Sequence, residues 1–311
     1  PINIAIVGED GPLYALEKAK EESLFDKDEP SYIPIGESYY DHSIINVELN
    51  KFNHSLLILG ENEKIQANIL KSIMIGALRN SGEILLLDES IDYEIGDLFG
   101  NHPSVTEYNA KTYLNMLEKA YSVFKERSEN RRQKFEPFYL ILDGLTVVED
   151  FLENKKKAIS TQKKDNKKET DDDLPDWYDT SFKDDYSFDD EQDTIKEDPI
   201  YGADTLFKML ESLNKVNNFF IIFTVDKTSS LKRYLSVAQE SDYIILHYPY
   251  VETMSQLVGN LYKNGVAQSC NENMALISEK GQSFMKFRYF KYDDDKETYK
   301  YIHNLGDLKW D

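Results

Sequence analysis

The first candidate for a chemical site in this sequence is a glycine that lies between an apolar run and a helical pattern. Gly60 follows the apolar run Ser55–Leu59, and apolar residues then recur at helical spacing over residues 65–78. The order strand, glycine, loop and helix is the frame of a phosphate-binding loop, whose working form is G-x-x-x-x-G-K-[ST]. In that form, backbone N–H groups and the helix N-terminus hold the phosphates, the lysine neutralises them, and the hydroxyl group binds Mg²⁺.

The side chains through which such a loop acts are replaced in this sequence. With Gly60 as the first glycine, the second glycine is Ile65, the lysine is Gln66 and the hydroxyl residue is Ala67. Lys64 lies two positions early, and Glu61 and Glu63, which precede it, would repel phosphate. A β-branched residue at position 65 also lacks the backbone freedom of glycine.

An acidic residue at the end of an apolar strand would be the second half of such a site. The run Phe138–Asp143 (FYLILD) ends in an acid of this kind, which orients Mg²⁺ from the strand beside the phosphate loop. The next residue, which is Glu or Asp in an active ATPase, is Gly144. A second run, Ile84–Glu89 (ILLLDE), also fits this strand motif and contains Asp88. Asp88 follows Gly60 by 28 positions, whereas Asp143 follows Gly60 by 83. For both acids the alternative is a cap on the turn after a buried strand, and this alternative is stronger for Asp88.

We therefore predict a vestigial nucleotide site with no catalytic residue and no metal ligands, formed by Gly60, Lys64, Gln66, Ala67 and Asp143. The remaining reactive residues form no chemical constellation. No two of the five histidines lie at the spacing of metal ligands with an acid or a cysteine. Cys270 has no basic or histidine neighbour that would make it a nucleophile. A single cysteine also excludes an internal disulfide and fits a reducing compartment.

The composition limits the class of protein. The 311 residues fit one large domain or two small ones, and 57 acids against 36 bases give a net charge of −21, which argues against a general nucleic-acid binder. Five bases gather near residues 125–134 (Lys125, Arg127, Arg131, Arg132 and Lys134), where we expect a charged, solvated helix end. No apolar run of about 18 residues and no signal peptide are found. The chain begins with Pro1, from which we expect a fragment of a longer protein.

Short apolar runs that alternate with longer helical patterns predict an α/β fold with a mostly parallel central sheet flanked by helices. Strands are expected at residues 2–7, 43–49, 55–59, 83–87, 138–142, 219–224 and 243–246, and a sheet edge or hairpin within 274–300. Helices are expected at residues 13–24, 65–78, 109–124 and 206–213. The second of these is apolar nearly all round and should be buried, and Asn109 is the expected cap of the third.

The helical and strand patterns stop between residues 153 and 199. Residues 155–168 contain seven Lys and one Asp, and residues 169–198 contain fourteen acids and two Lys. Too few aliphatic residues remain to offset the entropy of ordering, so we expect a flexible charged insertion. It is either a solvated loop whose aromatic residues dock on the parent domain or a partner-binding segment. The expected organisation is a strand, helix and linker over residues 1–32, followed by one domain over residues 33–311.

The order of these elements resembles the motor domains of the FtsK/SpoIIIE family. The resemblance covers about residues 33–295, with residues 33–36 (IPIG), 45–49 and 54–60 (HSLLILG) at its entry. Residues 82–88 resemble the second strand of that family, and residues 124–132 (FKERSENRR) its long helix with an Arg-rich end. Phe138–Asp143 takes the Walker B place, and residues 219–224 resemble the strand with the polar sensor. The resemblance implies a RecA-like P-loop NTPase fold with degenerate motifs.

Within that family, such erosion is typical of the C-terminal ATPase domains of the type VII secretion proteins EssC and EccC. The resemblance implies a cytoplasmic domain of a larger, membrane-anchored bacterial protein that recognises secreted WXG-type substrates, regulates the active ATPase domains of its own chain, or does both. It also implies a homo-hexamer of the full-length protein, no nucleic-acid partner and no required cofactor. The alternatives are a domain that binds ATP and Mg²⁺ weakly or hydrolyses ATP in an oligomer, and a DNA-translocase-like domain.

Overall fold

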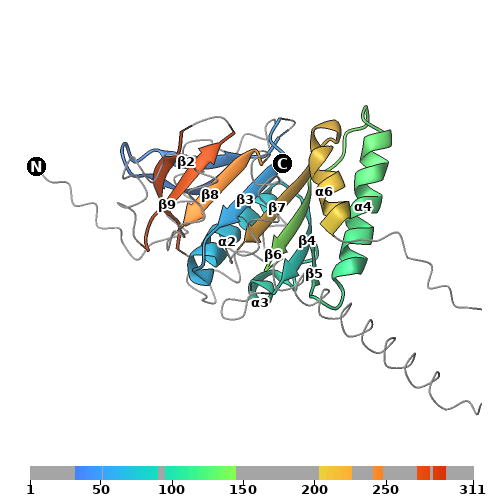
Figure 1. The fold of residues 1–311 in the computed structure, drawn as a ribbon, viewed down its shortest axis with the longest axis horizontal. Helices are drawn as coiled ribbons and strands as arrows, with labels where there is room; N and C mark the ends of the chain where they lie inside the picture. Colours follow the sequence, from blue (N-terminus) through green and yellow to red (C-terminus); the bar gives the residue numbers. More distant parts are fainter. Residues whose placement is uncertain are drawn as a thin grey trace, which may run out of the picture.

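A single sheet organises the part of the chain that the computed structural model describes, which is residues 32–50, 52–89, 95–144, 203–225, 241–247, 272–280 and 283–291 (Figure 1). Within these residues the strand order is β2-β1-β10-β9-β8-β3-β7-β6-β4-β5. The strands are β1 (Tyr32–Ser38), β2 (Ile44–Glu48), β3 (Ser55–Leu59), β4 (Glu83–Asp88), β5 (Val105–Tyr108), β6 (Phe138–Asp143), β7 (Phe219–Val225), β8 (Tyr243–His247), β9 (Ala275–Glu279) and β10 (Met285–Tyr289). The helices are α2 (Glu63–Arg79), α3 (Gly96–Phe99), α4 (Tyr113–Glu129), α6 (Ala203–Glu211) and the short 3₁₀ helix η1 (Leu213–Lys215).

One part of the sheet is parallel. The pairs β8–β3, β3–β7, β7–β6, β6–β4 and β4–β5 all run in the same direction. Every residue of β3, β6 and β7 is buried, which is why these strands read as continuous apolar runs in the sequence. The prediction of an α/β fold with a mostly parallel central sheet is confirmed.

The other part of the sheet is antiparallel. Strand β9 pairs with β8 and β10, and β10 pairs with β1, which forms a hairpin with β2. Of the two alternatives predicted within residues 274–300, the hairpin is therefore confirmed and the sheet edge is wrong. Strands β2 and β5 are the edges of the described sheet, because the β1–β2 hairpin pairs with the outer side of β10.

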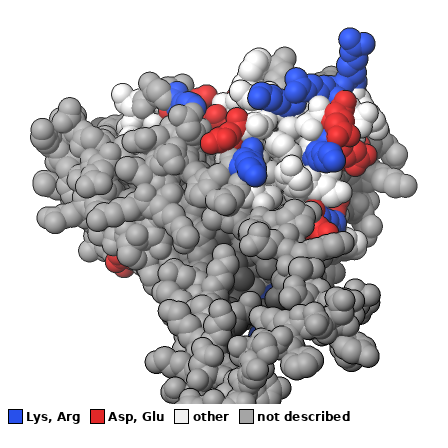
Figure 2. Space-filling model, turned by 45° about the vertical axis from the view of Figure 1, so that its right-hand side comes forward, with Lys and Arg blue, Asp and Glu red and all other residues white. Residues whose placement is uncertain are grey.

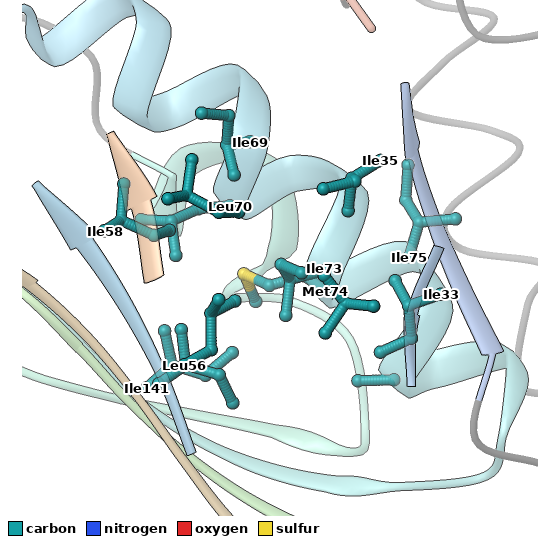
Figure 3. Close-up of a cluster of buried hydrophobic side chains, with 14 of the residues drawn as sticks. Ile33, Ile35, Leu56, Ile58, Ile69, Leu70, Ile73, Met74, Ile75 and Ile141 are labelled. Carbon is teal, nitrogen blue, oxygen red and sulfur yellow. The ribbon is translucent and has the colours of Figure 1, made fainter. Parts of the chain in front are cut away.

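Helix α2 fills one face of the sheet. As predicted, it is buried nearly all round, and its apolar side chains lie between β3 and the β1–β2 hairpin. Figure 3 shows Ile73 and Met74 of the helix between Leu56 of β3 and Ile33 of β1. This packing fixes the direction in which the helix leaves the end of β3.

Helices α4 and α6 cover the opposite face, where they lie side by side (Figure 1). The strands alternate between the two cores: Leu56 and Ile58 face α2, whereas Leu57 and Leu59 face α4 and α6. This alternation is the period of two that a strand buried on both sides must have.

The start of α4 differs from the prediction. The helix begins at Tyr113, after Thr112, rather than at Asn109. The Asn109 side chain instead accepts hydrogen bonds from the N–H groups of Lys111 and Thr112, so it forms a local turn that delays the helix. The four-residue elements β5 and α3 were not predicted either, because so short a segment carries no readable period.

Arg127 corrects the prediction of a fully solvated basic helix end. Its guanidinium is buried and donates to the carbonyl oxygen of Asn218 at 2.5 Å and to that of Asn217 at 3.4 Å. It also lies over the rings of Phe135 and Phe138, 5.0 and 5.5 Å from their centres. Arg127 thus joins the end of α4 to the chain that enters β7 and to the start of β6.

Replacing Arg127 with leucine should lower the free energy of unfolding by about 2 kcal/mol, because the carbonyl oxygens of Asn217 and Asn218 lose a charged donor and two rings lose their cation. For a chain of 311 residues the melting temperature should fall by about 3 °C. The same substitution at the exposed Arg132 is the control and should change it little. Equal melting temperatures for the two variants would contradict a structural role for Arg127.

The other four bases of this cluster are exposed, and the exposed acids Glu126, Glu129 and Glu136 lie near them in the sequence. Figure 2, in which the right-hand side of the Figure 1 view comes forward, shows Lys and Arg interspersed with Asp and Glu rather than a continuous basic surface. Among the described residues, no helix is both long enough and apolar enough to cross a membrane. The elements predicted within residues 1–32, the charged insertion at residues 153–199, Cys270 and His303 lie outside the described residues.

Candidate functional site

The connection between β3 and α2 is three residues long. Strand β3 ends at Leu59 and α2 begins at Glu63, so residues 60–62 alone join them. The frame G-x-x-x-x-G predicted from the sequence would extend to Ile65, which instead lies in the first turn of the helix with its side chain in the core. A loop that surrounds phosphate groups needs non-helical backbone over these positions.

Gly60 lies against the imidazole of His247, the last residue of the neighbouring strand β8. A Cβ atom at position 60 would lie 2.2 Å from Cε1 of His247, so no larger residue fits. The N–H of Gly60 donates to the carbonyl oxygen of Val225 at 3.3 Å. The glycine is explained by this close packing, and no pattern in the sequence indicated the contribution of His247.

The N-terminus of α2 is capped by its own chain. Oδ1 of Asn62 accepts a hydrogen bond from the N–H of Ile65 at 3.2 Å, and its carbonyl oxygen accepts from the N–H of Gln66 at 3.1 Å. Glu63 occupies the first turn. The cap satisfies one of the N–H groups through which a helix N-terminus attracts anions, and the acidic first turn opposes a further negative charge.

Asp143 is the centre of a buried polar cluster. Its Oδ1 accepts a hydrogen bond from Nε2 of Gln66 at 2.6 Å and another from the hydroxyl of Thr224 at 2.9 Å. The N–H of Gly144 donates to the same hydroxyl at 3.1 Å. Gln66, Asp143 and Thr224 are each at most 2% exposed. The cluster therefore connects α2 with the ends of β6 and β7.

Burial raises the pKa of the Asp143 carboxyl from 3.8 to about 7, and the nearby carboxylate of Asp88 adds to this rise. The hydrogen bonds from Thr224 and Gln66 act in the opposite direction and offset part of it. Desolvation disfavours the charged form of a carboxyl group, and a like charge close by disfavours it further. Near neutral pH the cluster thus contains a carboxyl group that is in part uncharged.

The five residues predicted as a nucleotide site are not all brought together. Gln66 and Asp143 are in direct contact, and Gly60 lies at the start of the loop before α2. Lys64 is exposed on the first turn of α2, whereas Ala67 is buried in the core. The strand order also puts β7 between β3 and β6, so Asp143 does not lie on the strand next to the loop.

The competing acid Asp88 has a structural role. In the register of β4 and β6 it lies beside Asp143, and its Oδ2 accepts from the N–H of Gly96 at 2.6 Å, at the start of α3. Glu89 accepts from the N–H of Ala110. Within the described ranges, no three His, Cys, Asp or Glu side chains are grouped so that they could hold a metal ion.

Gly144 follows Asp143 with a φ of +74°, in the left-handed region that favours glycine. A Cβ atom at this position would lie 2.8 Å from Cβ of Glu89. The position that carries a carboxylate in an active ATPase therefore has neither the backbone conformation nor the space for one in this structure.

Comparison of the sequence with models of protein families and with curated proteins finds no match. Solved structures do match. Thermomonospora curvata EccC (ATPases 2 and 3), in complex with a signal sequence peptide, has a TM-score of 0.55 and 10% identity over 86% of this chain and 42% of that chain. EssC (ATPases 2 and 3) from Geobacillus thermodenitrificans gives 0.53 and 12%, over 90% and 48%. The pCW3 conjugation coupling protein TcpA, in a structure with ATPγS, gives 0.58 and 12%, over 89% and 70%.

The chain thus has the RecA-like α/β fold of P-loop ATPase domains. In its fold it resembles the ATPase domains of the type VII secretion proteins EccC and EssC, and it spans less than half the length of those two structures. The resemblance to FtsK-type ATPase domains predicted from the sequence is confirmed at the level of the fold.

Proposed function

We propose that the chain is an FtsK-like ATPase-fold module of a type VII secretion motor that works without binding or hydrolysing a nucleotide. Its role is to recognise secreted WXG-type substrates, to regulate the active ATPase domains of its own chain, or both. The observation that carries the proposal is the hydrogen bond between Gln66 and Asp143, at the two positions where the family resemblance places the phosphate-binding lysine and the Mg²⁺-orienting acid.

The electrostatics around α2 support this proposal. Glu61 precedes the capped N-terminus of the helix, Glu63 lies in its first turn, and Lys64 is the one base close by in the sequence. A nucleoside triphosphate would bring several negative charges to the N-terminus of α2, which already has acids beside it. The −21 net charge of the chain and the mixed charges in Figure 2 likewise favour a protein partner over a nucleic acid.

One of the structures with a similar fold supports substrate recognition. The EccC structure that this chain resembles contains a signal sequence peptide. By this likeness we propose that the partners are secreted substrate proteins and other ATPase domains, within a cytoplasmic part of a membrane-anchored, hexameric protein. ATP and Mg²⁺ are not required in this proposal.

We expect calorimetric titration of the chain with ATP and Mg²⁺ to detect no binding at micromolar concentrations, and ATP hydrolysis to be negligible. The missing lysine, hydroxyl and carboxylate would each contribute about 3 kcal/mol or more to lowering the barrier. A Mg²⁺-dependent turnover that Asp143→Ala abolishes would contradict the proposal. It would favour the alternative in which the domain is an active motor within an oligomer.

Recognition is tested by a pull-down of the purified chain with the secreted proteins encoded at its own locus. Removing the C-terminal segment of each secreted protein supplies the matched control, because the resemblance to EssC and EccC implies that such substrates carry C-terminal export signals. Capture of the full-length forms, with loss of the truncated ones, is the expected result. Equal capture of both forms, or of neither, would contradict recognition of an export signal.

A further inference from the structure

Three elements that are distant in the sequence meet at one carboxyl oxygen. Oδ1 of Asp143, at the end of β6, accepts hydrogen bonds both from Gln66 in α2 and from Thr224 in β7. The N–H of Gly144 donates to the Thr224 hydroxyl and so adds a backbone group to the cluster. All of these contacts are buried, where hydrogen bonds are less screened than in water.

In a loaded nucleotide site, the phosphates and Mg²⁺ lie between the start of the helix and the acidic strand end, and both sides contact the ligand. In this chain the same two sides contact each other directly, over the 2.6 Å between Nε2 of Gln66 and Oδ1 of Asp143. The protein's own side chains therefore join the two sides directly.

We propose that Gln66 is a positioning residue that holds the start of α2 against the ends of β6 and β7 in place of a ligand. This inference rests on the proposed function, in which no nucleotide takes part. It implies that the surface at residues 60–64, with the exposed Glu61 and Lys64, keeps one conformation whether or not ATP is present. A partner that binds there would meet the same surface throughout the cycle of the motor.

Hydrogen exchange of the whole chain tests this role, because the amide of Gly144 reports the cluster directly. We compare the wild type with Gln66→Met, which keeps the length of the side chain but cannot donate, and with Gln66→Ala, which also removes its bulk. The matched control is Ser72→Ala, since the Ser72 hydroxyl donates to the carbonyl oxygen of Asn68 within α2 and its substitution leaves the Gln66–Asp143 bond in place.

The expected result is that both Gln66 variants exchange at least about tenfold faster at Gly144 and at the second turn of α2. Ser72→Ala should leave Gly144 unchanged, and ATP with Mg²⁺ should not slow exchange in the wild type. Equal exchange at Gly144 in the wild type and in Gln66→Met would overturn the positioning role, even if Gln66→Ala is too unstable to measure. That result would leave the proposed function standing, because nucleotide binding by the wild type is what would contradict the latter.

Discussion

Replacing Asp143 with asparagine is expected to stabilise the protein at pH 8, by up to about 4 kcal/mol. The carboxyl group is buried and its pKa is raised to about 7, so above that pH the folded state must hold a buried negative charge beside Asp88. Asparagine is nearly the same size and keeps an oxygen that can accept from Gln66 and Thr224, while it removes the charge. The expected gain is therefore electrostatic.

The pH dependence has a defined sign. Between pH 3.8 and about 7 the folded state keeps the proton on Asp143, whereas the unfolded state releases it. The stability of the wild type should therefore fall as the pH rises through this window, by about 1.4 kcal/mol per pH unit from this group. The advantage of Asp143→Asn should be largest at pH 8, shrink as the pH is lowered below 7, and vanish near pH 4.

Urea unfolding at pH 8, 6 and 4.5 measures this difference, with Asp97→Asn as the control because Asp97 is exposed on α3. The control should show no comparable dependence on pH. An Asp143→Asn variant less stable than the wild type at pH 8 would be the contrary outcome. It would mean that the ionised carboxylate is needed, as it would be for a bound cation, and would favour the nucleotide-binding alternative.

The central strands could be predicted because their burial on both faces is visible in the residues of each strand alone. Strands β3, β6 and β7 are buried on both faces, and such burial requires continuous apolar runs whatever the partners are. Helix α2 was predicted for the same reason, since its apolar residues occur nearly all round. Helix boundaries were less accurate, because the turn made by Asn109 competes with the helix cap over the same few residues.

The contacts of the candidate site depend on the register between neighbouring strands, which could not be predicted from the sequence. Leu142 pairs with Phe223, and this alignment brings the next residues, Asp143 and Thr224, into hydrogen-bonding distance. The sequence identified Asp143 and the strand that ends near Thr224, but it could not show that Gln66 reaches them. Arg127 had a readable signal, because it continues the helical stripe that includes Phe124 and packs against the sheet.

Replacing Gly144 with glutamate, which would restore the carboxylate of an active ATPase, is expected to destabilise the protein by about 3–5 kcal/mol. Three effects act together. The φ of +74° is unfavourable for a residue with a side chain. The new Cβ atom would lie 2.8 Å from that of Glu89. The new carboxylate would also join Asp143 and the acids near it.

Gly144→Ala separates these effects, since alanine adds the Cβ atom and the strained conformation but no charge. It should cost about half as much as Gly144→Glu. Thermal unfolding measures both variants, and ATP hydrolysis is assayed in parallel. A Gly144→Glu variant as stable as the wild type that hydrolyses ATP would show that the site lacks only its carboxylate. With no hydrolysis and a large loss of stability, the packing around Gly144 is incompatible with the active form of the motif, so reactivation would require rebuilding both strand ends together with the loop before α2.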